Sequence, residues 1–260
     1  MQSKAGRAVA CPMCADFFNS SRLAESEQSN RLAGVLPFSP VHAVSVHMAR
    51  GLLTDQGGWL TLWGTYGAGK SLVLTGLVAD SCRAGRLAQY WTGLDLLAAF
   101  QRDMSDGDKN EAGRGANLDF LSRIPVLALD EMTGFHTSSD WFARHFVELL
   151  DRRYRNADHL ITIMALNPDP ADWCSGPGGA WGISGPAILS RMRDGRFCRS
   201  WEGFAWPKGM RPYQELAQSP VIPGIIHFDA PDVRPLLRRG NNPSPAARED
   251  GRGQRSTTST

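Results

Sequence analysis

Long apolar runs and a regular set of cysteines are both missing from this chain of 260 residues. Its longest apolar stretches, such as residues 124–129, fall far short of the roughly 18 residues that a membrane-spanning helix needs. The five cysteines are odd in number and scattered, which is typical of free thiols or a partial metal site and not of a disulfide framework. Residues 1–10 lack the apolar core of a secretory signal. We therefore expect a cytoplasmic protein without a membrane span.

A surplus of charge is also missing. The chain has 28 Lys and Arg against 26 Asp and Glu, a formal charge of +2, which argues against binding nucleic acid by bulk charge alone. Residues 231–260 hold six arginines and three carboxylates, so the other 230 residues hold 22 basic and 23 acidic side chains and carry −1. Any DNA contact should therefore come from local arginines, with the tail adding salt-sensitive, non-specific attraction.

The order of apolar and amphipathic segments predicts an α/β fold with a parallel sheet covered on both faces. We expect residues 1–34 to form an N-terminal partner-binding arm with a short helix near residues 21–34, and residues 35–215 to form the main domain. Residues 216–260 should be a largely disordered C-terminal extension. The expected strands are residues 59–63, 88–92, 125–130, 160–166 and 197–201, and the expected helices are residues 71–84, 94–104, 139–156 and 185–193.

Residues 64–71 read GTYGAGKS and match the phosphate-binding pattern GxxxxGK[ST], with an apolar strand before them and a helical pattern after them. Glycines in such a loop let backbone N–H groups point at phosphate oxygens, and the following helix adds the positive end of its dipole. Lys70 would reach the β- and γ-phosphates, and Ser71 would bind Mg²⁺. Lysine is scarce, with only four in the chain, so a chance lysine here would be uncommon. The predicted ATP-binding residues of the loop are Gly64, Thr65, Tyr66, Gly67, Ala68, Gly69, Lys70 and Ser71.

Two later strands also end in polar side chains. The first ends in Asp130 and Glu131, where Asp130 would hold Mg²⁺ through water and Glu131 would polarise the attacking water. A glutamate directly after the aspartate favours an ATPase over a GTPase. The next strand ends in Asn167, which would sit beside the γ-phosphate, although the residues around it also fit a simple turn.

Arg191 is one of four arginines within nine residues. An arginine at such a helix end is suitably exposed to stabilise transition-state charge in a neighbouring subunit. A solvated basic helix end is the alternative interpretation.

Five stretches in order resemble the DnaC-type and IstB-type AAA+ ATPases: GTYGAGKS, YWTGLDLLAAF, LSRIPVLALDEMTGF, FVELLDRRYRNADHLITIMALN and AILSRMRDGRF. The resemblance spans about residues 38–201 and implies a five-stranded AAA+ P-loop core. It assigns Asn167 as the first sensor and Arg191 as the arginine finger that acts in trans. The sequence after residue 201 lacks the family's usual arginine, and Arg211 is the nearest substitute, so we expect a reduced C-terminal lid.

The resemblance implies an ATP-binding and ATP-hydrolysing DNA replication protein, a loader of the replicative helicase. Such proteins form homo-oligomers with ATP between subunits and bind DNA, here expected to be single-stranded. We expect slow, DNA-stimulated hydrolysis. The alternatives are a transposition helper of the IstB type, whose N-terminal domain is normally longer, and a nucleotide-dependent adaptor with little hydrolysis.

Cys11 and Cys14 resemble half of the four-cysteine zinc module that some helicase loaders carry near the N-terminus. Zinc takes four ligands, and no second cysteine pair lies nearby. His42 and His47 would complete a site only with an unusual spacing. Zinc binding and two free thiols therefore both stay open.

Overall fold

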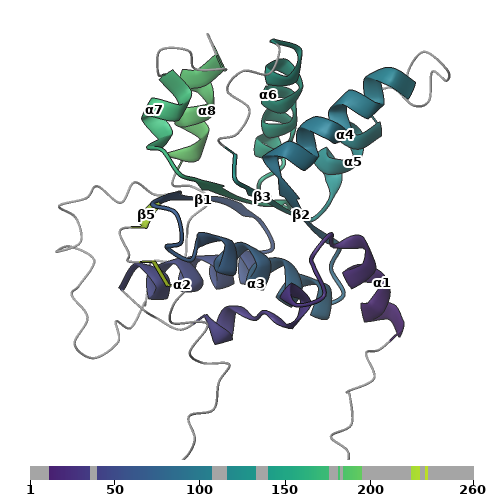
Figure 1. Ribbon diagram of the computed structural model, residues 1–260, viewed down its shortest axis with the longest axis vertical. Helices are drawn as coiled ribbons and strands as arrows, with labels where there is room; N and C mark the ends of the chain where they lie inside the picture. Colours follow the sequence, from purple (N-terminus) through teal and green to yellow (C-terminus); the bar gives the residue numbers. More distant parts are fainter. Residues whose placement is uncertain are drawn as a thin grey trace, which may run out of the picture.

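A five-stranded parallel sheet lies at the centre of the protein, with helices on both faces (Figure 1). The strand order is β2-β3-β4-β1-β5. The computed structural model describes residues 12–35, 40–106, 116–132, 140–175, 181, 184–194, 224–228 and 232–233. The strands are β1 (Gly58–Gly64), β2 (Ala88–Thr92), β3 (Val126–Asp130), β4 (Ile161–Leu166) and β5 (Ile225–Phe228).

Burial explains why the central strands read as continuous apolar runs. Strands β3 and β4 are buried at every position, so side chains on both faces of the sheet are covered. In β3, Val126 and Ala128 join the core on one face, whereas Leu127 and Leu129 join the core on the other. The predicted α/β fold with a five-stranded parallel sheet is confirmed.

The fifth strand comes from a different segment than expected. Strand β5 pairs with β1 and lies within residues 216–260, the predicted C-terminal extension. Residues 197–201, the expected fifth strand, lie outside the described residues, as does the region of the expected lid around Arg211. Because β5 has only four residues, it is too short to produce a clear apolar period.

The helices divide between the two faces. Helices α1, α2 and α3 lie on one face of the sheet, and helices α4 to α8 lie on the other (Figure 1). The predicted helices that correspond to α3, α4, α6 and α8 agree with the structure to within two residues at each end. The helices are α1 (Pro12–Ser20), α2 (Pro40–Asp55), α3 (Lys70–Arg83), α4 (Gly93–Asp106), α5 (Ala116–Arg123), α6 (Asp140–Arg155), α7 (Pro170–Ser175) and α8 (Gly185–Met192).

The N-terminal segment packs against the main domain. In place of the helix expected near residues 21–34, the chain forms two short 3₁₀ turns, Glu27–Ser29 and Leu32–Gly34. Leu32 is 1% exposed, and its backbone N–H donates to Asp80 of α3 at 3.0 Å. The Tyr90 backbone N–H of edge strand β2 donates to the Ser21 carbonyl, so this segment also covers part of the sheet edge.

Candidate functional site

The loop between β1 and α3 has the backbone that the phosphate-binding motif requires. Gly64, Gly67 and Gly69 have φ of 140°, 76° and 95°, values that side chains rarely adopt. Gly64 also lies against β5, since a Cβ on it would come within 2.4 Å of the Phe228 carbonyl oxygen. The glycines therefore serve both the curvature of the loop and its close packing on the sheet.

Lys70 begins α3 and is 6% exposed. Its Nζ donates to the carbonyl oxygens of Gly64 and Thr65, each at 2.8 Å. An ammonium group has three N–H donors, so the two bonds orient the side chain and leave one donor for a phosphate oxygen. Burial lowers the pKa of Lys70, and the charge of Asp130 opposes that shift.

Asp130 ends β3 and is held from two sides. Its Oδ2 accepts the hydroxyl of Tyr90 from the neighbouring strand β2 at 2.6 Å, and its Oδ1 accepts the Glu131 backbone N–H at 2.8 Å. Asp130 is only 3% exposed. Burial, followed by the charge of Asp130, raises the pKa of Tyr90, so the hydroxyl stays protonated and continues to donate.

Glu131 turns sharply out of the strand. Its φ of 52° lies in the left-handed region, which costs a non-glycine residue of order 1 kcal/mol and is common at functional sites. The side chain is exposed, in contrast to the buried Asp130. Asn167 follows the end of β4, the strand next to β3, and lines the same cavity as the two carboxylates.

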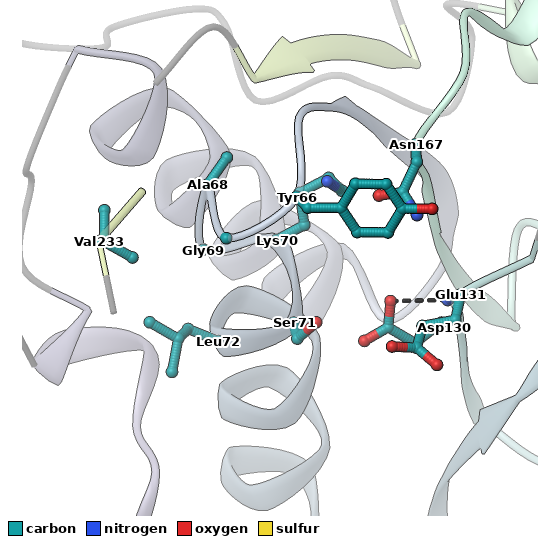
Figure 2. Close-up of a pocket in the computed structure, with 11 residues that line it drawn as sticks. Tyr66, Ala68, Gly69, Lys70, Ser71, Leu72, Asp130, Glu131, Asn167 and Val233 are labelled. Atoms are coloured by element: carbon teal, nitrogen blue, oxygen red, sulfur yellow. Dashed lines mark hydrogen bonds between the residues drawn. The ribbon is translucent and has the colours of Figure 1, made fainter. Parts of the chain in front are cut away.

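These groups surround one cavity of about 300 Å³. Ser71 and the two carboxylates face each other across it, and Tyr66, 71% exposed, lies at its open side (Figure 2). The structure thus brings together six of the eight predicted loop residues, both carboxylates and Asn167, whereas Gly64 and Thr65 do not line the cavity. The cavity is lined by Tyr66, Gly67, Ala68, Gly69, Lys70, Ser71, Leu72, Asp130, Glu131, Asn167 and Val233.

The donor set fits the phosphates of ATP with Mg²⁺. The glycine loop and the start of α3 supply a concave backbone of the kind that binds phosphate, and Lys70 adds a cation. The Ser71 hydroxyl and the Asp130 carboxylate are oxygen ligands, which Mg²⁺ prefers and usually complements with phosphate oxygens and water. Ser71 and Asp130 would therefore hold the Mg²⁺ that accompanies ATP.

Two residues beneath the loop were not predicted as part of the site. The buried His42 of α2 has its Nε2 2.8 Å from the Ala68 carbonyl oxygen, and burial lowers its pKa. Neutral His42 can therefore donate from Nε2 to the loop. The Val233 backbone N–H donates to the Gly67 carbonyl at 3.0 Å. Both residues lie far from the motif in sequence, and no local pattern marks them.

Arg191 does not line the cavity of its own subunit. It lies near the end of α8 and forms an ion pair with Asp151 of α6. Its side chain is 22% exposed. Its role in the ATP site of a neighbouring subunit therefore stays a prediction.

The predicted cysteine pair lies at the margin of the structure. Cys11 is outside the described residues, and only the backbone of Cys14 is described. Across the ranges that the structure describes, His, Cys, Asp and Glu form no group of three or more suited to a metal ion. Within those same ranges, no helix has the length and apolar character needed to cross a bilayer.

Comparisons with solved structures agree with the fold. A crystal structure of DnaI matches 82% of this chain and 95% of its own, with a TM-score of 0.52 and 15% identity. A crystal structure of the DnaC helicase loader matches 65% of this chain and 94% of its own, with a TM-score of 0.51 and 19% identity. At these identities the likeness establishes the fold alone.

The sequence comparison identifies the family. No curated protein sequence matches the chain significantly. The family model described as "IstB-like ATP binding protein" matches residues 46–175, half of the chain. That range contains the phosphate-binding loop, both carboxylates and Asn167. The chain therefore belongs to the family of IstB-like ATP-binding proteins.

Proposed function

We propose that this protein hydrolyses ATP and uses the cycle of binding and hydrolysis to load a replicative helicase onto DNA. The observation that carries the proposal is the convergence of Lys70, Ser71, Asp130, Glu131 and Asn167 on one cavity. A protein that only bound nucleotide would need the loop but not an exposed carboxylate opposite it.

Each side chain has a distinct part in the proposed reaction. Lys70 donates to the phosphate oxygens, and Asp130 and Ser71 hold the ion. When bound, Mg²⁺ neutralises charge that develops on the phosphates. Glu131 accepts a hydrogen bond from the attacking water and orients it in line with the γ-phosphate, while Asn167 binds the same water or the γ-phosphate.

We propose that the active form is a homo-oligomer with ATP at each subunit interface. The exposed side of the cavity, marked by Tyr66, supports this arrangement because a second copy would complete the enclosure there. Arg191 of that copy would donate to the γ-phosphate in the transition state. An arginine supplied in this way accelerates phosphoryl transfer by about 10³- to 10⁵-fold in well-studied NTPases.

The choice of a helicase as partner rests on similarity to DnaI and to a protein described as a helicase loader. The family match favours a second candidate, a transposition helper, because the matching model is named for IstB. The two candidates share the same ATP chemistry and differ in the partner. A binding assay with the full chain should therefore compare a purified replicative helicase with a purified transposase, each with ATP and with ADP.

Steady-state ATP turnover with and without single-stranded DNA tests the chemistry. We expect slow turnover that DNA stimulates, and Glu131→Gln should lose turnover while retaining affinity for a fluorescent ATP analogue. Absence of turnover under both conditions would favour a nucleotide-dependent adaptor. Loss of nucleotide affinity in Glu131→Gln would contradict the assignment of Glu131 to catalysis alone.

A further inference from the structure

Two pairs of side chains link the end of α8 and the residues just after it to the end of α6. Arg191 Nη2 donates to Oδ1 of Asp151, and the Tyr154 hydroxyl donates to Oδ2 of Asp194. The guanidinium carbon of Arg191 also lies 5.5 Å from the centre of the Tyr154 ring. We call these four residues the α6–α8 clamp. Asp151 and Tyr154 are three positions apart on α6, and Arg191 and Asp194 are three positions apart along the chain, so the two contacts lie side by side.

The ion pair with Asp151 leaves N–H donors of Arg191 that can still bind an anion. A guanidinium has five N–H donors, and the ion pair with Asp151 engages one of its nitrogens. The other carboxylate oxygen of Asp151 lies 2.5 Å from Nη2 of Arg155, whose side chain is 74% exposed. Asp151 therefore shares its carboxylate between two guanidiniums, and its contact with Arg191 uses only one of its two oxygens.

The partial burial of Arg191 and Asp151 restrains the arginine and still leaves it accessible to another molecule. The side chains of Arg191 and Asp151 are 22% and 21% exposed, so they are partly shielded from water yet accessible from outside. An arginine fixed before it meets its target loses less side-chain freedom on contact than a mobile one. Preorganisation of this kind acts on the rate of the chemical step.

We propose that Asp151 is a positioning residue, which fixes Arg191 in the orientation that reaches ATP bound by a second copy of this chain. The inference rests on the proposed function, because that function supplies the second copy and its ATP. It goes further by assigning a role to Asp151 on α6, a residue outside the nucleotide cavity. Tyr154 supports the same orientation by holding the Arg191 guanidinium over its ring and Asp194 beside it.

Subunit mixing isolates the arginine from the rest of the molecule. Arg191→Ala subunits have an intact ATP site but no arginine to donate, and Glu131→Gln subunits have a blocked site but an intact arginine. Mixed assemblies should therefore recover turnover that neither variant has alone. Adding Asp151→Asn to the Glu131→Gln subunit then changes the donated arginine without touching any active ATP site.

We expect the Asp151→Asn donor to lower kcat of the mixture about tenfold, with KM for ATP unchanged, and Asp151→Glu to recover most of the loss. Glu148→Gln in the donor is the matched control, because Glu148 lies on the same helix and pairs with Arg152, not with Arg191. It should leave kcat of the mixture unchanged. Thermal melting of each donor confirms that it is folded.

The outcomes separate the two proposals. Equal turnover with Asp151→Asn and unmodified donors would overturn the role of Asp151 while leaving the arginine finger intact. If the first mixture recovers no turnover although the wild type is active, Arg191 does not act in trans, and both the proposed assembly and this inference fail. An Asp151→Asn effect that Glu148→Gln reproduces would show a general effect of α6 charge and would also overturn the inference.

Discussion

Replacing Tyr90 with phenylalanine should weaken the response to Mg²⁺ more than the binding of nucleotide itself. The Tyr90 hydroxyl donates to Oδ2 of Asp130 at 2.6 Å and does not line the cavity. Tyr90→Phe keeps the ring, which packs against the core, and removes only the donor. The Asp130 carboxylate would then keep the hydrogen bond from the Glu131 backbone N–H.

Two independent estimates give the size of the effect. A hydrogen bond to a charged group contributes about 1.5–3 kcal/mol, and each 1.4 kcal/mol corresponds to a factor of ten. Loss of a side chain that orients a metal ligand typically costs about 10- to 100-fold in metal affinity or activity. Since the remaining bond at 2.8 Å still restrains Asp130, we expect the lower end, about tenfold.

Titration of ATP turnover with free Mg²⁺ measures this directly. The Mg²⁺ concentration at half-maximal turnover should rise about tenfold in Tyr90→Phe, while affinity for ATP in the absence of Mg²⁺ stays as in the wild type. Thr92→Val is a matched control from the same strand, because its hydroxyl accepts the Asp95 backbone N–H at the start of α4. It should lower the melting temperature without changing the Mg²⁺ response. An unchanged or lower Mg²⁺ requirement in Tyr90→Phe would refute the reasoning.

The same contact predicts a dependence of folding stability on pH. Burial and the charge of Asp130 raise the folded-state pKa of Tyr90 above the unfolded value of about 10. The unfolded chain therefore releases this proton first, so the contribution is complete below about pH 10 and is lost as the pH rises further. Urea unfolding between pH 9 and 11 should show a steeper alkaline loss of stability in the wild type than in Tyr90→Phe. Parallel curves would contradict this.

Three further changes test the loop, the buried arginine and the N-terminal segment. Gly69→Ala should lower ATP affinity about tenfold in a fluorescent-ATP titration. An alanine at this left-handed φ costs about 1–2 kcal/mol, and its Cβ would lie 2.8 Å from Nε2 of His42. Gly34→Ala is the control, because a Cβ there would meet open space. Arg153→Met should lower the free energy of unfolding, measured in urea, by about 3 kcal/mol. The reason is that the fully buried guanidinium donates to three carbonyls and to the Thr162 hydroxyl. Unchanged stability would mean that the cost of burying the guanidinium equals the gain from these hydrogen bonds. Leu32→Ala should cost about 2–5 kcal/mol in the same assay, because Leu32 lies in the core; an unchanged free energy of unfolding would contradict its packing there.

The parts of the fold that the sequence predicts are those that depend on local order. Strands β3 and β4 are apolar runs buried at every position, and β1 is buried at every position but Trp63. Helix α6 carries a clear amphipathic period with Phe146 and Leu149 in the core. The phosphate-binding loop is encoded within eight consecutive residues. Because parallel strands end at one edge of the sheet, the polar residues after β3 and β4 had to meet there.

The parts that the sequence leaves open depend on contacts between distant segments. Whether Ile225–Phe228 pairs with β1 is decided by the edge of a sheet formed more than 150 residues earlier. Leu32 of the N-terminal arm lies in the core, which the sequence does not predict because isolated leucines in a polar stretch give no period. Tyr90 looked like an ordinary strand residue until the pairing of β2 with β3 placed its hydroxyl beside Asp130.

The division between structural and chemical residues at the site determines which variants are informative. Gly64 and Gly69 are packed against Phe228 and His42, so changing them disturbs the fold and the phosphate site together. Asp130 is buried and accepts the hydroxyl of the half-buried Tyr90, so its removal takes away the acceptor of that hydroxyl. Glu131 differs from all of these because its side chain is exposed and its backbone, not its carboxylate, holds Asp130. A change of Glu131 to glutamine therefore alters the chemistry of the cavity while leaving its walls in place, which makes it the cleanest test of hydrolysis that this chain offers.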